Sequence, residues 1–227
     1  MVFLLDVDNT LLDNDRVTAD LRAYLETSFG AERAMRYWTI FEELRTEMGY
    51  ADYLGALQRY RLQPDDGITH HQQMLLMSSF LLEYPFAERL FAGAIDVIRH
   101  LGQFGRTVIL SDGDVVFQPR KVQRSGIWDA VEGRVLIYIH KEQMLESVER
   151  LYPAQRYVMI DDKVRLLDAM KSIWRDRLTT VFPRQGHYAL DAAAVAKYRT
   201  PDVTVEQIGE LSTIDVSRWR DSPRAAP

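Results

Sequence analysis

The sequence contains no cysteine, which excludes disulfide bonds, thiolate catalysis and cysteine-ligated zinc sites. It has no run approaching the ~20 apolar residues of a membrane-spanning helix. Residues 1–5 lack the basic flank and the length of a signal peptide. Basic residues are also few, since 28 Lys and Arg are outnumbered by 33 Asp and Glu. We therefore expect a cytoplasmic protein without a membrane or nucleic-acid partner, because nucleic-acid binding favours a basic surface.

Two aspartates directly follow the first apolar run. Residues 2–5 are typical of a short buried strand of a parallel sheet, and Asp6 and Asp8 come after them, one residue apart. In open α/β sheets, ligands bind outside the carboxyl ends of the strands. Two carboxylates there can hold a divalent cation and divide nucleophile and acid/base roles between them. The alternative interpretation is a solvated Asp-X-Asp turn at the end of a strand.

Residues 14–85 are predicted to form an all-helical insert. Apolar residues recur there at helical spacing over 21–29, 37–48 and 53–60, and Thr69 is placed to cap a fourth helix. No strand-like alternation interrupts this stretch, and Pro85 marks its expected end.

From Phe86 onward the sequence alternates between strand and helix patterns. The expected helices cover 86–101, 115–124, 141–151, 166–173 and the region of Ile208 and Leu211; the expected strands cover 107–110, 135–139, 157–160, 178–182 and 202–205. Such alternation predicts an α/β fold with a parallel sheet covered by helices on both faces, a three-layer Rossmann-like core. The chain then divides into a core of residues 1–13 and 86–217, the insert 14–85, and a loose tail 218–227.

Polar clusters follow three of the predicted strands, 2–5, 107–110 and 157–160, and a lysine opens the helix that precedes the last of them. Because the carboxyl ends of parallel strands share one edge of a sheet, these groups are expected to meet. Simpler interpretations exist for single residues: Ser111 as a helix cap, Lys141 as a solvated lysine with Lys121 and Lys163 as rivals, and Asp162 as a helix cap. The clusters are residues 6–10, residues 111–114, Lys141, and the pair Asp161 and Asp162.

With these motifs the chain resembles the haloacid dehalogenase-like hydrolase superfamily, most of whose members are magnesium-dependent phosphatases. Residues 6–10 match its first motif, Asp-X-Asp-X-Thr, with Asn9 where glycine is commonest. Ser111 matches the second motif, Lys141 the third, and Asp161 with Asp162 the acidic pair of the fourth. The helical insert corresponds to the cap of that family, the part that selects the substrate.

The resemblance implies a role for each of these residues. Asp6 would attack phosphorus and form an aspartyl-phosphate, while Asp8 would act as general acid and base. Ser111, the amides near Asp112 and Gly113, and Lys141 would bind the phosphate. Mg²⁺ would be held by the Asp6 carboxylate, the Asp8 backbone carbonyl and Asp161, with Asp162 binding directly or through water.

The predicted function is therefore magnesium-dependent hydrolysis of a small phosphorylated metabolite. A phosphomutase would keep all four motifs and differ only in the cap. A dehalogenase would also use Asp6 as nucleophile but would need no second acid such as Asp8. A non-catalytic binding module would be expected to have lost a motif, and the chain has lost none.

Overall fold

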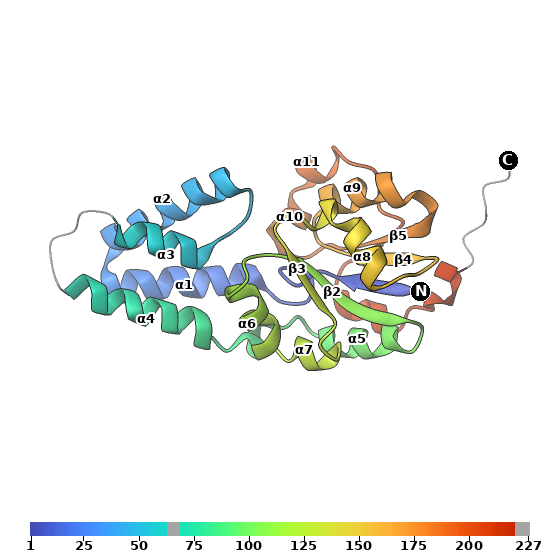
Figure 1. Ribbon diagram of the computed structural model, residues 1–227, viewed down its shortest axis with the longest axis horizontal. Coiled ribbons are helices and arrows are strands. Elements are labelled where there is room, and N and C mark those ends of the chain that lie inside the picture. The colour runs from blue at the N-terminus through green and yellow to red at the C-terminus, as the bar shows by residue number, and fades with distance from the viewer. Residues whose placement is uncertain (63–68, 221–227) are drawn as a thin grey trace.

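Six short runs of mainly aliphatic and β-branched residues form one parallel sheet in the computed structural model, which describes residues 1–62 and 69–220 (Figure 1). The strands lie in the order β3-β2-β1-β4-β5-β6, so the first strand of the chain is central. Their bounds are β1 Val2–Leu5, β2 Arg106–Asp112, β3 Val135–Tyr138, β4 Tyr157–Ile160, β5 Leu178–Pro183 and β6 Val203–Val205. The predicted parallel sheet is confirmed.

Helices cover both faces of the sheet. Side chains alternate along a strand, so Phe3 and Leu5 of β1 pack in one hydrophobic cluster and Val2 and Leu4 in another. Helices α5 (Ala94–Gly102), α6 (Phe117–Arg124) and α7 (Ile127–Ala130) contribute to the first cluster. Helices α8 (Leu145–Leu151), α9 (Val164–Trp174), α10 (Gly186–Leu190) and α11 (Ala192–Val195) contribute to the second. The three-layer α/β core is therefore confirmed (Figure 1).

Four helices between β1 and α5 extend from one end of the sheet (Figure 1). Their bounds are α1 Asn14–Phe29, α2 Ala31–Met48, α3 Tyr53–Arg61 and α4 Thr69–Glu83. Asp13 caps α1 by accepting a hydrogen bond from the Arg16 N–H (2.9 Å), and α2 ends at Gly49, whose φ of 77° is left-handed. The predicted capping by Thr69 lies outside the described side chains. We call this part, α1–α4, the helical segment.

The helical segment shares its hydrophobic core with the sheet domain. Tyr53 of α3 and Phe117 of α6 pack edge to face with ring centroids 5.2 Å apart. In addition, Arg89 donates a hydrogen bond to Asp20 of α1 (2.9 Å), and the Tyr84 hydroxyl donates to the same carboxylate. Apolar packing thus holds α3 against α6, and a polar network holds α1 against the chain that returns to the sheet.

Some element predictions were wrong. A 3-10 helix occupies Phe86–Arg89 and α5 starts only at Ala94, because Gly93 takes a left-handed φ of 80° between them. The turn through Ile208 and Leu211 is also a 3-10 helix, Ile208–Ser212. The tail was expected to start at Arg218, but a 3-10 helix continues over Val216–Arg220 and its Trp219 ring packs 6.5 Å from Phe3. Residues 221–227 lie outside the described part.

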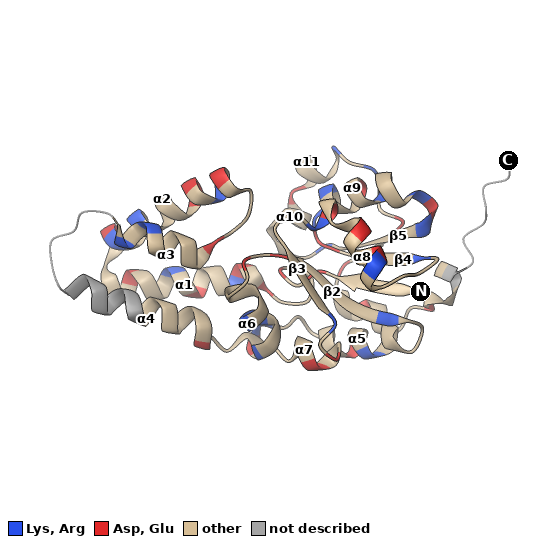
Figure 2. Cartoon of the chain, in the orientation of Figure 1, with Lys and Arg blue, Asp and Glu red and all other residues tan. Residues whose placement is uncertain are grey.

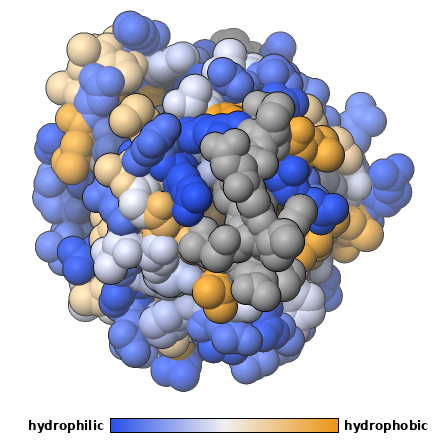
Figure 3. All heavy atoms as spheres, turned by 90° about the vertical axis from the view of Figure 1, so that its left-hand side faces the viewer, coloured by the Kyte–Doolittle hydropathy of each residue, from blue (hydrophilic) through white to orange (hydrophobic). Residues whose placement is uncertain are grey.

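Charged residues lie mostly on helices, loops and strand ends, and the sheet interior is apolar (Figure 2). Seen from the end of the helical segment, the surface is mainly hydrophilic with scattered hydrophobic side chains (Figure 3). Exposed large hydrophobic residues among those described in that segment include Met35, Leu62 and Leu76. Among the described helices, none combines the length and apolar character that crossing a membrane requires.

Candidate active site

The register of the sheet brings Asp6 beside two other polar strand ends. Leu5, the last residue of β1, pairs with Ile109 of β2 and with Ile160 of β4. Asp161, one residue beyond β4, is therefore the neighbour of Asp6 on one side. Ser111 lies on the other side, and its hydroxyl donates to Asp6 Oδ1 over 3.3 Å. Asp6, Ser111 and Asp161 thus lie together at one edge of the sheet, as predicted.

Lys141 lies fully buried between two of these carboxylates. Its Nζ donates to Asp6 Oδ1 (2.5 Å) and to the Leu110 carbonyl (3.3 Å), and it forms an ion pair with Asp161 Oδ2 (2.7 Å). Burial by itself would lower the pKa of Lys141, but the charges of Asp161, Asp6 and Asp112 outweigh it and raise that pKa. Lys141 is therefore a permanent cation at neutral pH, and its rivals Lys121 and Lys163 do not occupy this position.

Three buried carboxylates form a cluster around this lysine. One oxygen from each of Asp6, Asp161 and Asp162 lies within 4.8 Å of the others. Burial raises the pKa of Asp161 to about 6, despite the opposing charge of Lys141, and burial also raises the pKa of Asp162 well above its usual value. Asp6 Oδ2 and Asp162 Oδ2 are buried and have no hydrogen-bond partner. Because unpaired buried carboxylate oxygens are costly, and hard oxygen ligands suit Mg²⁺, this donor set fits a divalent cation.

Asp8 lies outside the three-carboxylate cluster. Its two carboxylate oxygens accept hydrogen bonds from Lys121 Nζ at 2.7 and 2.9 Å. The Asp8 side chain is 25% exposed, and Asp8 is one of the residues that line a cavity. The two aspartates of the first motif therefore have separate surroundings: Asp6 is held by Lys141 and Ser111, whereas Asp8 is held by Lys121.

The loop that carries both aspartates is held from two directions. Asn9 has a left-handed φ of 60°, which Asn tolerates better than most residues. Gln185 Nε2 donates to the carbonyls of Asn9 (3.3 Å) and Thr10 (2.8 Å). The Thr10 hydroxyl accepts from the Asp162 N–H (3.0 Å). The threonine of the first motif thus ties the loop that carries Asp6 and Asp8 to the acidic pair.

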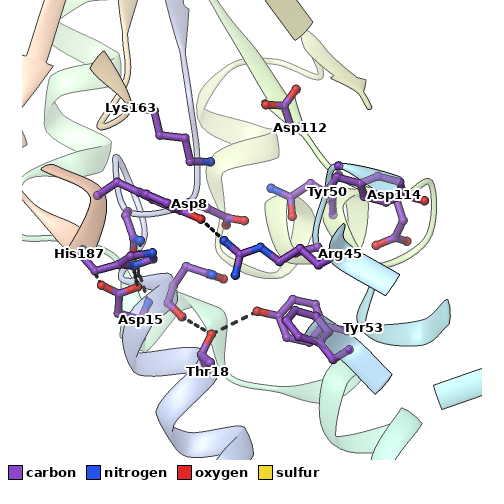
Figure 4. A pocket seen from close by; sticks show the side chains of 18 of the residues that line it. Asp8, Asp15, Thr18, Arg45, Tyr50, Tyr53, Asp112, Asp114, Lys163 and His187 are labelled. Carbon is purple, nitrogen blue, oxygen red and sulfur yellow. Dashed lines mark hydrogen bonds and ion pairs between the residues drawn. The ribbon is translucent and has the colours of Figure 1, made fainter. Parts of the chain in front are cut away.

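A cavity of about 680 Å³ lies between the helical segment and the sheet edge. Thr18, Arg45, Tyr50 and Tyr53 line it from the helical segment, and Asp8, Asp112, Lys163 and His187 line it from the core (Figure 4). The cavity is therefore large enough for a small organic molecule, which its walls would contact from both the helical segment and the core.

The loop after Ser111 does not offer every donor expected of it. Asp112 Oδ1 accepts from the Lys141 N–H (2.8 Å), so this side chain fixes the turn before the lysine. The Gly113 N–H donates to the Tyr138 carbonyl (2.9 Å) and is not free to bind a phosphate, which corrects that expectation. Asp114 accepts from the Phe117 N–H (2.6 Å) at the start of α6.

Several residues at the site escaped the sequence analysis. Gln118 Nε2 donates to the Ser111 hydroxyl (3.0 Å), and the Arg45 guanidinium donates to the Tyr188 hydroxyl across the cavity. His187 lines the cavity with Nδ1 2.6 Å from Asp15 Oδ1 (Figure 4). No motif or periodicity marks these residues. Arg45 and His187 act through partners more than a hundred positions away, and Gln118 acts through Ser111, seven positions away.

Comparisons with known proteins show what the chain is similar to. The family model for haloacid dehalogenase-like hydrolases matches residues 1–173. A crystal structure of a protein from Burkholderia xenovorans LB400, described as a haloacid dehalogenase-like hydrolase, is 65% identical, covering 94% of this chain and 98% of its own, with a TM-score of 0.88. No curated protein matches the sequence.

Two more distant structures share the fold alone. L-2-haloacid dehalogenase from Xanthobacter autotrophicus is 18% identical, with 96% of this chain and 98% of that one covered and a TM-score of 0.61. A structure of the haloacid dehalogenase-like hydrolase YfnB from Bacillus subtilis, bound to magnesium, is 18% identical, with 92% of this chain and 96% of that one covered and a TM-score of 0.57.

Proposed function

The chain belongs to the haloacid dehalogenase-like hydrolases, and on that premise we propose that it is a magnesium-dependent phosphatase acting on a small organic phosphate monoester. The observation that carries the proposal is the buried cluster of Asp6, Asp161 and Asp162, in which two carboxylate oxygens have no hydrogen-bond partner. A carboxylate that attacks a phosphate dianion must overcome repulsion between like charges. A site that gathers three acids and leaves oxygens free for a cation is suited to that reaction.

The residues divide the chemistry between them. The Asp6 carboxylate attacks phosphorus, the bond from phosphorus to the leaving oxygen breaks, and that oxygen takes a proton from Asp8. Asp8 then takes a proton from a water molecule, whose oxygen attacks the same phosphorus and displaces Asp6 to release inorganic phosphate. Ser111 and Lys141 orient Asp6 throughout. Asp6, Asp161 and Asp162 would hold Mg²⁺, which supplies positive charge that offsets the repulsion between nucleophile and phosphate.

The helical segment is proposed to act as the cap that contacts the leaving group. Its residues Arg45, Tyr50 and Tyr53 form the wall of the cavity opposite the strand ends. Only 2% of Asp6 is exposed, so a phosphate reaches it only when neighbouring groups move. Contacts between α1–α3 and the leaving group would therefore both select the substrate and exclude water during the reaction.

Haloacid dehalogenation is the second candidate, favoured by the shared fold of the Xanthobacter autotrophicus enzyme. A dehalogenase displaces halide from carbon with a single carboxylate. That chemistry gives no role to Asp8 or to the unpaired oxygen of Asp162, which is why phosphate hydrolysis is preferred here.

One experiment separates the two candidates. Phosphate release from para-nitrophenyl phosphate and chloride release from chloropropionic acid are measured with Mg²⁺ and with a chelator. We expect phosphate release that requires Mg²⁺ and that falls at least ~10²-fold in Asp6→Asn, the size of loss typical when one such catalytic group is removed. Asp129→Asn, an exposed aspartate on α7, is the matched control. Chloride release without phosphate release would refute the proposal.

A further inference from the structure

Lys121 is a buried lysine outside the set of residues just assigned to the reaction. It lies on α6, and only 1% of its side chain is exposed. Its Nζ donates to Asp8 Oδ1 (2.7 Å), to Asp8 Oδ2 (2.9 Å) and to Asn14 Oδ1 (2.9 Å). An ammonium group has three donors, so every proton of Lys121 is used within the protein.

These contacts leave Lys121 unable to bind a substrate directly without giving one of them up. Its Nζ also lies 5.0 Å from the centre of the Phe117 ring, an attractive cation–π distance. A lysine that is buried at a cost and held by three acceptors and an aromatic ring keeps one orientation. What it orients is Asp8, because both oxygens of that carboxylate point to the same ammonium.

We propose that Lys121 is a positioning residue for Asp8, holding the proposed acid/base group in the orientation from which it exchanges protons with the leaving oxygen and with water. The inference rests on the proposed phosphatase function. Each Asp8 oxygen has a further lone pair beyond its bond to Lys121, and 25% of the side chain is exposed. Asp8 can therefore be held and still reach a group in the cavity.

The third acceptor extends this arrangement to the helical segment. Asn14 is the first residue of α1, so Lys121 joins Asp8 to the point where the helical segment leaves the core. The orientation of Asp8 is consequently tied to the position of α1. Asn14→Ala, which removes this acceptor together with the hydrogen bond between the Asn14 side chain and the Tyr53 hydroxyl, should disturb Asp8 in the same way as loss of Lys121 but less strongly.

The test is a double-mutant cycle read through the leaving group. Single-turnover phosphorylation of the enzyme is measured with para-nitrophenyl phosphate, whose leaving group needs no proton, and with an alkyl phosphate, whose leaving group does. In Lys121→Met the rate with the alkyl phosphate should fall about 10²-fold, the loss expected for a misplaced catalytic group. The fold loss with the aryl phosphate should be at least ten times smaller. Adding Lys121→Met to Asp8→Asn should cause little further loss, because both changes remove the same function.

Two controls separate positioning from general damage. Arg124→Met removes one positive charge from the same helix, where Arg124 contacts the Glu83 carbonyl and not Asp8; it should leave both rates unchanged. Because the chain has no cysteine, Lys121→Cys can be alkylated at that position alone with bromoethylamine in denaturant and then refolded. The new ammonium should restore the alkyl rate, and circular dichroism verifies folding of each variant.

The outcomes are distinct. Equal losses for the two esters in Lys121→Met, or losses that multiply when it is combined with Asp8→Asn, would overturn the positioning role. If Lys121→Met fails to fold, Asn14→Ala decides by the same comparison, since it leaves the Lys121–Asp8 ion pair in place. Absence of Asp6-dependent phosphate release from the wild-type protein would instead overturn the proposed function, and with it the role of Lys121.

Discussion

Replacing Lys141 by methionine should strongly destabilise the metal-free protein. The side chains are similar in length, but methionine supplies no charge between Asp6 and Asp161, whose oxygens lie 2.5 and 2.7 Å from Lys141 Nζ. Both carboxylates are buried, and Asp162 adds a third at this position. The change therefore leaves buried acids without their cation, which is among the most costly changes a core can undergo.

The size of the effect follows from the two contacts. At these separations Coulomb's law with an effective dielectric constant of 20 gives about 6 kcal/mol for each pair. Much of this is offset by the cost of burying the charges, so removal of one partner typically costs about 3–5 kcal/mol. For a chain of this size, 1 kcal/mol corresponds to a shift in melting temperature of about 2–4 °C. Lys141→Met should therefore lower the melting temperature by about 6–20 °C in a chelator at neutral pH.

The loss should depend on pH and on Mg²⁺. Burial already raises the pKa of Asp161 to about 6, and loss of Lys141 should raise it further. As pH falls, Asp161 and Asp162, whose pKa values burial raises, bind protons and lose the charge that makes their burial costly, so the variant should approach the wild type towards about pH 4. At neutral pH a bound cation offsets the same buried negative charge, and Mg²⁺ at 100 times its Kd stabilises the folded protein by about 2.7 kcal/mol.

Thermal melts followed by circular dichroism, with a chelator or with Mg²⁺, test this reasoning. Lys197→Met, which removes one exposed positive charge, serves as the control and should melt within about 2 °C of the wild type. If Lys141→Met in chelator also melted within that margin, the acids would not be charged as argued. If Mg²⁺ did not raise its melting temperature more than that of the wild type, the cation site would be refuted.

Three further predictions concern the same region. Asp161→Asn should stabilise the metal-free protein above about pH 6, because burial raises the native pKa of Asp161 to about 6, whereas its unfolded value is about 4. The stability that the protonated form of Asp161 contributes is lost as pH rises through that range, and asparagine keeps the side chain neutral. A lower urea midpoint for the variant than for the wild type, measured in a chelator at neutral pH, would contradict this. Gly186→Ala should lower the free energy of unfolding by about 2–4 kcal/mol, because φ is +77° and an added Cβ would lie 2.4 Å from the Cβ of Asn9, so backbone strain adds to a steric clash. Gly126→Ala, where φ is +81° but no atom lies near the added Cβ, should show only the loss due to backbone strain. Equal urea midpoints for the two variants would refute the packing argument. Turnover of para-nitrophenyl phosphate should be supported by Mg²⁺ and inhibited by excess Ca²⁺, which takes more ligands at longer distances; equal rates with either ion would show that the geometry at Asp6 does not matter.

Much of the fold could be predicted because its signals are local. The strand predicted over 157–160 is β4 as observed, and the run at 2–5 is β1. Buried parallel strands are short and almost entirely apolar, so they contrast sharply with the amphipathic helices between them. The wrong predictions occur where backbone geometry, not the hydrophobic pattern, sets the ends of an element. At Gly93, for example, a left-handed φ separates the 3-10 helix from α5, although the apolar spacing continues across it.

The sequence by itself determined which chemical groups end each strand: Asp6 and Asp8 after the first, Ser111 in the second, and Asp161 with Asp162 after the fourth. Parallel strands share an edge, so strand identity alone was enough to predict that these groups would meet. Only the tertiary structure decided how charges pair there. Lys141 serves Asp6 and Asp161, and Lys121 serves Asp8. Asp6 and Asp8 each lie more than a hundred positions from the lysine that pairs with them. Strand order and side-chain direction set these pairings, and no local sequence pattern indicates strand order or side-chain direction.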